Sequence, residues 1–302
     1  MKTDENVLQG STGDRIVIID KPRGPSSHQV TAWAGEILGA DVGHSGTLDP
    51  AVSGVLVVMT GKAVRLAPLL LKEEKEYVCL MRLHGPAVAG KISESFEEFT
   101  GRIYQRPPKK SAVARNLRIR TIRELELLDM QDRLILFRVV CDAGTYIRTL
   151  CHHLGLYLGC GAHMQELRRT RSGRFDEKMA HTLQDLLDAR LLADQGDRSE
   201  LDNMLLPPEH ALGGEEGIVV RDTAVDALCH GAALSGVGIL RMPPFRKGEL
   251  VTVWTRRGEL ICLGETLVSS EKAAPGEHGL VIAPRTVFLA PSTYPRGWKR
   301  RS

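Results

Sequence analysis

The sequence contains no long apolar run: none of its hydrophobic stretches approaches the roughly 20 residues that a membrane-spanning helix needs. The first 14 residues are polar and lack the basic start and apolar centre of a secretion signal. Internal repeats and low-complexity tracts are also missing. The chain has 302 residues, of which 42% are hydrophobic and 25% charged, so we expect a soluble, cytoplasmic protein of two domains with no membrane partner.

The six cysteines are scattered and form no Cys-x-x-Cys pair. This spacing argues against a structural zinc site and is typical of reduced thiols in a cytoplasmic protein. The run Cys151, His152 and His153 resembles a set of metal ligands, but adjacent residues diverge on a helix and no second pair of ligands has suitable spacing. We therefore expect no metal.

Acidic residues are absent from 102–123, where eight lysines and arginines occur. A second basic cluster covers 168–174, and a basic tail, 296–302, ends the chain. Any one of these blocks is explained most simply as solvated surface charge. Three such blocks on a chain with a net charge of only +3 favour a surface that faces a polyanion, and nucleic acid in particular.

Local patterns predict an α+β fold with mixed sheets, because strands and helices alternate without regular βαβ repeats. The expected strands of the first part are 15–20, 75–83, 117–128 and 134–141. The expected helices are 29–38, 64–71, 92–99, 145–158 and 182–192. No element is predicted for 162–172. Beyond a Pro- and Gly-rich boundary at 207–214, short strands at 217–220, 238–241, 250–255 and 260–267 indicate a small β-barrel-like domain.

A single carboxylate, Asp49, lies between a glycine-punctuated loop (43–48) and the apolar run 55–59. Pro50 biases Asp49 away from helical geometry, so the aspartate is expected on an extended or turn segment. A packed scaffold that presents an acid on a loop is a common way to place a catalytic group. The alternative is that Asp49 only shapes a turn, as most Asp-Pro pairs do.

Four segments match a known pattern together: GHSGTLDP (43–50), KEYV (75–78), GTYIR (144–148) and HMQELRRTRSG (163–173). The chain resembles the TruB/dyskerin class of RNA pseudouridine synthases, most closely the archaeal catalytic subunit of the H/ACA guide-RNA ribonucleoprotein. The resemblance implies a mixed-sheet catalytic domain over 14–210 and a PUA RNA-binding domain over 215–295. A flexible tail (1–13) and the basic tail (296–302) complete the expected organisation.

The resemblance also implies residue roles. Asp49 matches the catalytic aspartate, Arg148 the arginine that pairs with it, and Tyr77 the tyrosine that stacks on the target base. His44 matches a histidine implicated in flipping the nucleotide, although a His beside glycines is equally consistent with a loop hydrogen bond. Leu167 matches an apolar residue that floors the base pocket, and Lys21 and Pro22 match a motif that braces the site. Stretch 102–123, with Lys109, Lys110 and Arg115, matches a mobile thumb loop that closes over RNA.

The implied reaction converts uridine to pseudouridine and needs neither cofactor nor metal, because it involves no redox step and no hydrolysis. The leading interpretation is an enzyme that acts chiefly on ribosomal RNA, directed by guide RNA and assisted by small H/ACA proteins. The main alternative is a guide-independent enzyme that modifies the T-loop uridine (uridine 55) of tRNA. A non-catalytic RNA-binding scaffold is a third possibility, which the joint presence of Asp49, Tyr77 and Arg148 disfavours.

Overall fold

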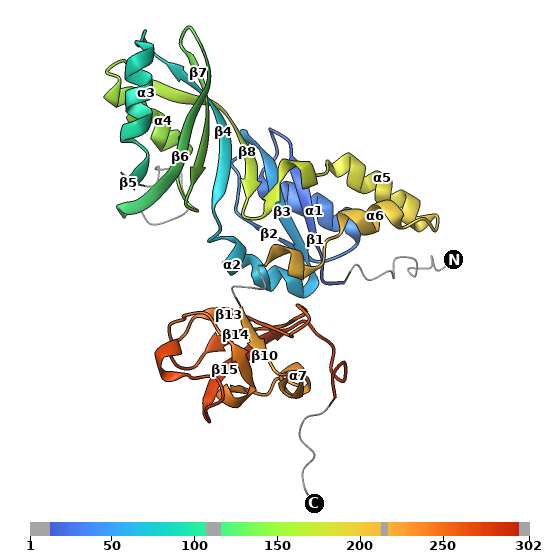
Figure 1. The fold of residues 1–302 in the computed structure, drawn as a ribbon. Helices are drawn as coiled ribbons and strands as arrows, with labels where there is room; N and C mark the ends of the chain where they lie inside the picture. Colours follow the sequence, from blue (N-terminus) through green and yellow to red (C-terminus); the bar gives the residue numbers. More distant parts are fainter. Residues whose placement is uncertain (1–12, 107–115, 213–216, 296–302) are drawn as a thin grey trace, which may run out of the picture. The chain divides into compact units, whose positions relative to one another are not determined.

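The computed structural model describes residues 13–106, 116–212 and 217–295 (Figure 1). Its backbone forms two compact units. One consists of residues 17–58 and 70–204; the other consists of 59–69 and 205–302 together with the start of the chain. None of the helices in the described part of the chain is long and apolar enough to cross a membrane.

The unit formed by 17–58 and 70–204 is built on a mixed sheet with the strand order β1-β3-β8-β4-β7-β6-β5. Strand β8 lies at its centre, parallel to β3 and antiparallel to β4, and β2 and β9 attach to β3 and β8. The strands are β1 (Ile16–Lys21), β2 (Val42–Ser45), β3 (Val52–Thr60), β4 (Lys75–Leu83), β5 (Gly101–Gln105), β6 (Arg118–Gln131), β7 (Leu134–Cys141), β8 (Ala162–Ser172) and β9 (Phe175–Asp176).

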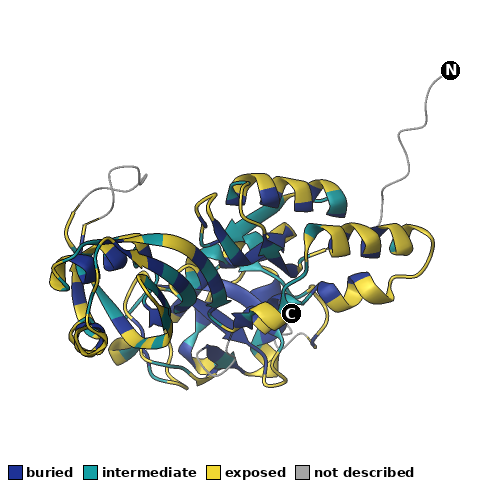
Figure 2. Cartoon of the chain, turned by 90° about the horizontal axis from the view of Figure 1, so that it is seen from above, coloured by how far each residue is buried: buried dark blue, intermediate teal, exposed yellow. Residues whose placement is uncertain are grey.

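The helices of this unit begin where the sequence offers a cap. Ser26 and Thr182 each accept a backbone N–H in a reciprocal capping box, at the starts of α1 and α5. Helix α4 packs on β8 and β4, and α3 packs on β6. Buried residues follow the strands, whereas the outer faces of the helices are exposed (Figure 2). The helices are α1 (Ser27–Leu38), α3 (Ala89–Glu98), α4 (Ile147–Tyr157), α5 (Leu183–Asp194) and α6 (Ser199–Met204), whereas most of α2 (Ala67–Leu70) belongs to the other unit.

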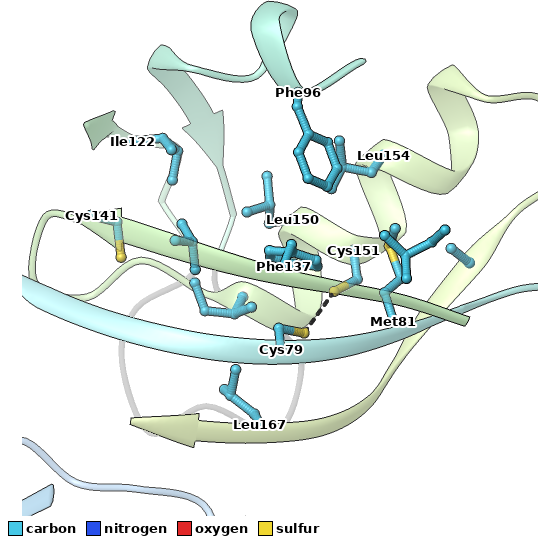
Figure 3. Close-up of a cluster of buried hydrophobic side chains, with 14 of the residues drawn as sticks. Cys79, Met81, Phe96, Ile122, Phe137, Cys141, Leu150, Cys151, Leu154 and Leu167 are labelled. Carbon is cyan, nitrogen blue, oxygen red and sulfur yellow. Dashed lines mark hydrogen bonds between the residues drawn. The ribbon is translucent and has the colours of Figure 1, made fainter. Parts of the chain in front are cut away.

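The main hydrophobic core lies between β4, β7 and β8 on one side and α3 and α4 on the other (Figure 3). Phe96 of α3 meets Phe137 of β7 edge to face, with ring centroids 5.5 Å apart. The thiols of Cys79 and Cys151 are 3.6 Å apart and fully buried. Cys151 is therefore a core residue. This agrees with the expectation that the side chains of residues 151–153 point in different directions from one helix. Within the described residues, no group of three or more His, Cys, Asp or Glu side chains is arranged to hold a metal ion.

The other unit contains a six-stranded sheet of near-barrel shape, with the order β11-β15-β14-β13-β10-β12. Its core is made of β-branched and leucine side chains together with helix α7 (Asp222–Cys229). The strands are β10 (Ile218–Val220), β11 (Leu234–Ser235), β12 (Ile239–Arg241), β13 (Leu250–Trp254), β14 (Leu260–Thr266) and β15 (Leu280–Val287). The predicted α+β architecture with a second, β-barrel-like part is confirmed.

The sequence missed β8, β5, β11 and β15. The family resemblance implied a loop over all of 102–123, whereas the side-chain pattern predicted a strand from residue 117 onward. Residues 102–105 belong to β5 and 118–123 to β6, and these two strands pair in antiparallel fashion. The expectation of a thumb loop over the whole stretch is therefore wrong at both ends. Backbone pairing to β6 stabilises the short strand β5, which the side-chain pattern alone does not reveal. Lys109, Lys110 and Arg115 lie outside the described residues.

Candidate active site

The Asp49 loop is held by buried side chains from α1 and β1. The Ser27 hydroxyl accepts the Leu48 N–H at 2.8 Å and donates to the Leu48 carbonyl at 2.9 Å. The Lys21 ammonium donates to the carbonyls of Pro22 and Val52, each at 2.8 Å. Both Ser27 and Lys21 are 0% exposed, so hydrogen bonds that are shielded from water fix the backbone on both sides of Asp49. Lys21 thus has the bracing contacts that the resemblance implies.

The Asp49 carboxylate itself faces solvent, with its side chain 60% exposed, and its Oδ2 accepts from Arg148 Nη2 at 2.8 Å. Arg148 is the second residue of α4, where its positive charge opposes the helix dipole. The start of α4 is fixed by Gln105 of β5, which is 2% exposed. Its side-chain amide accepts the Tyr146 N–H at 2.9 Å and donates to the Tyr146 carbonyl at 3.2 Å. Sequence reasoning missed Gln105 because its partner lies 41 residues away.

Tyr77 and Leu167 lie on the neighbouring strands β4 and β8. In the antiparallel register, Tyr77 is opposite Arg169 and Cys79 is opposite Leu167, so these four residues share one face of the sheet. Leu167 is also paired with Val52, three residues after Asp49. Tyr77 is partly buried, and burial raises the pKa of its phenol, so the phenol is neutral at physiological pH. The ring and the apolar Leu167 are therefore next to the Asp49 loop.

His44 precedes the loop on β2, and its ring packs edge-on against His28 of α1 with centroids 5.0 Å apart. Burial, and next the charges of His28 and Arg169, lower the pKa of His44 from its ordinary value. The imidazole is therefore neutral near pH 7. Its Nδ1 is buried and has no hydrogen-bond partner within the described residues. The alternative role for His44 was a hydrogen bond within the loop. Its Nδ1 makes no such bond within the described residues.

Two further buried cations underlie the loop, and sequence reasoning assigned neither a role there. Arg169 is 1% exposed and Lys75 is 4% exposed. Lys75 donates to the carbonyls of Leu70 at 3.0 Å and Glu73 at 2.7 Å. Burial, followed by repulsion from Arg169, lowers the pKa of Lys75 to about 8. The one available sequence signal was their place in the matched segments KEYV and HMQELRRTRSG.

The structure therefore brings together four of the predicted site residues, Asp49, Arg148, Tyr77 and Leu167, with His44 beside them. The arrangement offers one solvent-facing carboxylate, one guanidinium that orients it, and an aromatic and an apolar side chain on the adjoining strands. Such a set suits attack on, or proton removal from, a polar substrate whose flat ring is held against the strands.

Three family models match consecutive parts of the chain. The TruB family pseudouridylate synthase N-terminal domain matches 37–147, the tRNA pseudouridylate synthase B C-terminal domain matches 148–213, and the PUA domain matches 216–288. The probable tRNA pseudouridine synthase B of Methanosarcina barkeri is 48% identical over 289 residues, covering 95% of this chain and 86% of that protein. Its counterpart in Methanocaldococcus jannaschii is 49% identical with the same coverage.

Solved structures agree with these matches. The chain superimposes with a TM-score of 0.87 and 43% identity on a chain of a Cbf5-Nop10-Gar1 complex, covering 94% of this chain and 88% of that one. It also matches a chain of an H/ACA ribonucleoprotein bound to a substrate RNA containing 2'-deoxyuridine, with a TM-score of 0.83, 38% identity and coverage of 99% and 96%. The chain belongs to the TruB family of RNA pseudouridine synthases, and its C-terminal part is a PUA domain.

Proposed function

We propose that this enzyme isomerises specific uridines in RNA to pseudouridine with Asp49 as the catalytic carboxylate. The observation that carries the proposal is the 2.8 Å contact between Asp49 and Arg148, on a loop whose backbone is fixed but whose carboxylate is exposed. A planar guanidinium that hydrogen-bonds a carboxylate orients it. Asp49 is then available to react at a ribose that is brought to it.

The reaction breaks the bond between C1' of the ribose and N1 of uracil, turns the base, and forms a bond from C1' to C5. Asp49 either attacks the ribose as a nucleophile or removes a ribose proton to give a glycal-like intermediate. In both routes the proton at C5 is finally lost and no oxidant or water is consumed. The detached uracil must stay in place while it turns. We propose that Tyr77 and Leu167 hold it there.

The uridine has to leave its stack to reach Asp49, which costs a few kcal/mol. Stacking on Tyr77 contributes about 1–3 kcal/mol and offsets part of that cost. We propose that His44 contacts the nucleotide as it flips, because the His44 ring lies beside the Asp49 loop. The Nδ1 atom of His44 is buried and has no hydrogen-bond partner within the described residues. The basic residues Lys109, Lys110 and Arg115 are proposed to contact RNA phosphates.

The test of Asp49 is its isosteric amide. We expect Asp49→Asn to abolish pseudouridine formation while RNA affinity stays within about twofold, since the amide keeps the shape and loses the charge and nucleophilicity. Asp41→Asn, at an exposed aspartate before β2, is the matched control and should leave the product yield unchanged. Normal product from the Asp49 variant would exclude the proposed site.

We further propose that guide RNA directs the enzyme, chiefly to ribosomal RNA. The support is the likeness to chains solved in complexes with Nop10, with Gar1 and with substrate RNA. The partners would be guide RNA, the target RNA and small H/ACA proteins. In this proposal the PUA domain, defined as residues 215–295, holds the guide, and 14–210 forms the catalytic domain. A pocket of about 390 Å³ that includes Arg241, Trp254 and Arg256 is a candidate contact in the PUA domain.

A second candidate function is guide-independent modification of the tRNA T-loop uridine. The support is the similarity to archaeal relatives that are named probable tRNA pseudouridine synthase B. The experiment is to incubate the enzyme with bare tRNA transcript, and separately with guide RNA, partner proteins and a ribosomal RNA fragment, and to map every new pseudouridine. Product only in the second reaction supports guide dependence, whereas product at the T-loop in the first supports the alternative.

The proposed RNA contacts of Lys109, Lys110 and Arg115 have a test of their own. Each phosphate contact contributes to the salt dependence of RNA binding. Reversing the charge at Lys109, Lys110 and Arg115 together should weaken binding and flatten the plot of log affinity against log salt. An unchanged slope would remove these residues from the RNA interface.

A further inference from the structure

Arg169 of β8 joins the start of the Asp49 loop (residues 46–51) to strand β3, which follows that loop. Its Nη2 donates to the Gly46 carbonyl at 2.8 Å and its Nε donates to the Val55 carbonyl at 2.8 Å. Gly46 precedes Asp49 by three residues and Val55 follows it by six. Because a guanidinium is planar and holds its N–H groups in a fixed fork, these two contacts set the separation and orientation of the start of the loop and strand β3.

The same guanidinium interacts electrostatically with the phenol of Tyr77, which lies directly opposite Arg169 in the β4–β8 register. The hydrogen bonds of its side chain in the described part of the chain go to two carbonyls rather than to a carboxylate. Burial lowers the pKa of Arg169, which shows that holding a charge at this position is unfavourable. Stability alone therefore does not account for an arginine here.

We propose that Arg169 is a positioning residue for the isomerisation: it holds the Asp49 loop and the Tyr77 phenol in one rigid frame. This inference rests on the proposed function. The carboxylate and the aromatic ring come from different strands, and both must meet one nucleotide at once. A displacement of about 1 Å between reacting groups can lower the rate about 100-fold. One guanidinium that is hydrogen-bonded to Gly46 and Val55, and that lies opposite Tyr77 in the sheet, prevents that displacement without touching the substrate.

The test exploits the difference between arginine and lysine. Arg169→Lys keeps the charge, but a single ammonium on a flexible stem cannot span Gly46, Val55 and Tyr77. With saturating RNA we expect kcat to fall about 10- to 100-fold while KM stays within about twofold, because Arg169 contacts no substrate. The control is Arg190→Lys on α5, another buried arginine, 8% exposed, that pairs with Asp194 outside the site. Its kcat should match that of the wild type.

A spectroscopic readout separates positioning from a general loss of structure. The chain has five tyrosines. In protein labelled with fluorotyrosine, Tyr77→Phe identifies the Tyr77 resonance, and Arg169→Lys should shift that resonance while leaving the other four in place. An unshifted Tyr77 signal, or a kcat equal to that of the Arg190 control, would overturn the proposal. A shift of all five signals would also overturn it, because it would indicate a structural role only.

Should Arg169→Lys not fold, the link can be tested in a chain that keeps the arginine. Tyr77→Phe removes only the phenol oxygen, and we expect it to move the Nε–H resonance of Arg169 in a nitrogen-15 spectrum. An unmoved resonance would overturn the proposal. If the wild type forms no pseudouridine, the proposed function fails. If Asp49→Asn still forms it, the proposed site fails. In both cases the two spectra still report on the link between Arg169 and Tyr77. If only the Arg169 variant is unaffected, the proposed function stands and this inference fails.

Discussion

The guanidinium of Arg148 and the carboxylate of Asp49 meet at 2.8 Å although 99 residues separate them in the chain. Each is delivered by its own anchored segment: Asp49 by a loop that Ser27 and Lys21 fix, and Arg148 by a helix whose start Gln105 fixes. Neither side chain is buried, since their exposed fractions are 60% and 50%. A site that acts on a large polymer needs reactive groups that the polymer can reach and a backbone that is held in place. The exposed Asp49–Arg148 pair on segments held by buried hydrogen bonds meets both needs.

Arg148→Lys should lower kcat about 100-fold, because lysine cannot orient the Asp49 carboxylate through a planar fork. The free energy of unfolding should change by less than about 1 kcal/mol, since exposed ion pairs contribute little to stability. Single-turnover release of tritium from RNA labelled at uridine C5, together with urea unfolding, measures both quantities. Arg198→Lys, at an exposed pair on α6, should leave both unchanged. Unaltered kcat in the Arg148 variant would refute the orienting role.

Lys75 gives the protein a predictable pH dependence. Burial lowers its pKa to about 8 in the folded chain, whereas the ordinary value of 10.5 applies when it is unfolded. Between these values the unfolded state binds more protons than the folded state, so the free energy of unfolding rises with pH across this window. The rise totals about 3 kcal/mol, at 1.36 kcal/mol per pH unit between the two values. Below pH 8 Lys75 is protonated in both states, so the free energy of unfolding no longer changes with pH through this group.

Urea unfolding at pH 8 and pH 10 measures the effect, and Lys75→Met isolates it from other groups that titrate in the same range. The variant should show a smaller rise between the two pH values than the wild type. It should also be less stable at pH 8, because the carbonyls of Leu70 and Glu73 lose their donor. An identical pH response in the two proteins would mean that Lys75 titrates in the folded state as it does in the unfolded state.

The cysteines should differ sharply in reactivity. Five of the six are buried, and Cys160 is the partly exposed one. Burial raises the pKa of Cys141 and of Cys262 to about 12, and the hydrogen bond with Cys151 is the largest cause that raises the pKa of Cys79. Because the thiolate is the reactive form, native protein should release about one equivalent of thionitrobenzoate quickly with Ellman's reagent.

The remaining five thiols should react only as fast as the protein unfolds. Cys160→Ser is the matched variant and should remove the fast phase entirely. Two or more fast equivalents from native wild-type protein would contradict the burial of the core cysteines. The same experiment bears on Cys79 and Cys151, whose sulfur atoms are 3.6 Å apart, because a disulfide between them would reduce the total after unfolding by two.

The sequence predicted the parts of the site whose signals are local. The Asp-Pro pair and flanking glycines placed Asp49 on a loop, and the alternation of 75–83 placed Tyr77 on a strand with the bounds that β4 has. Strand β8 was missed because its sequence, AHMQELRRTRS, is crowded with charged residues. Arg169 can be buried there only because carbonyls 114 and 123 residues away accept its hydrogen bonds.

Long-range partners explain the other gaps as well. The pairing of Arg148 with Asp49 was expected from the family resemblance, and the only local signal was a cation at an unfavourable helix start. Gln105 gave no signal at all, because an amide on an exposed-looking strand is usually solvated. Strands β11 and β15 of the C-terminal sheet were missed because their pairing to one another and to β14 defines them, rather than an alternating side-chain pattern.

Gly54 tests how closely β3 and β8 must approach beneath the Asp49 loop. Its φ is +103°, and a Cβ there would lie 2.2 Å from the Arg169 carbonyl oxygen. Gly54→Ala should therefore cost at least about 3 kcal/mol of unfolding free energy and abolish activity, because relieving the clash separates the strands. Gly39→Ala, at φ +62° with no atom within 4 Å of the new Cβ, carries only the left-handed backbone penalty of about 1–2 kcal/mol and should stay active. Equal losses of stability in urea would show that backbone conformation, rather than strand contact, requires the glycine.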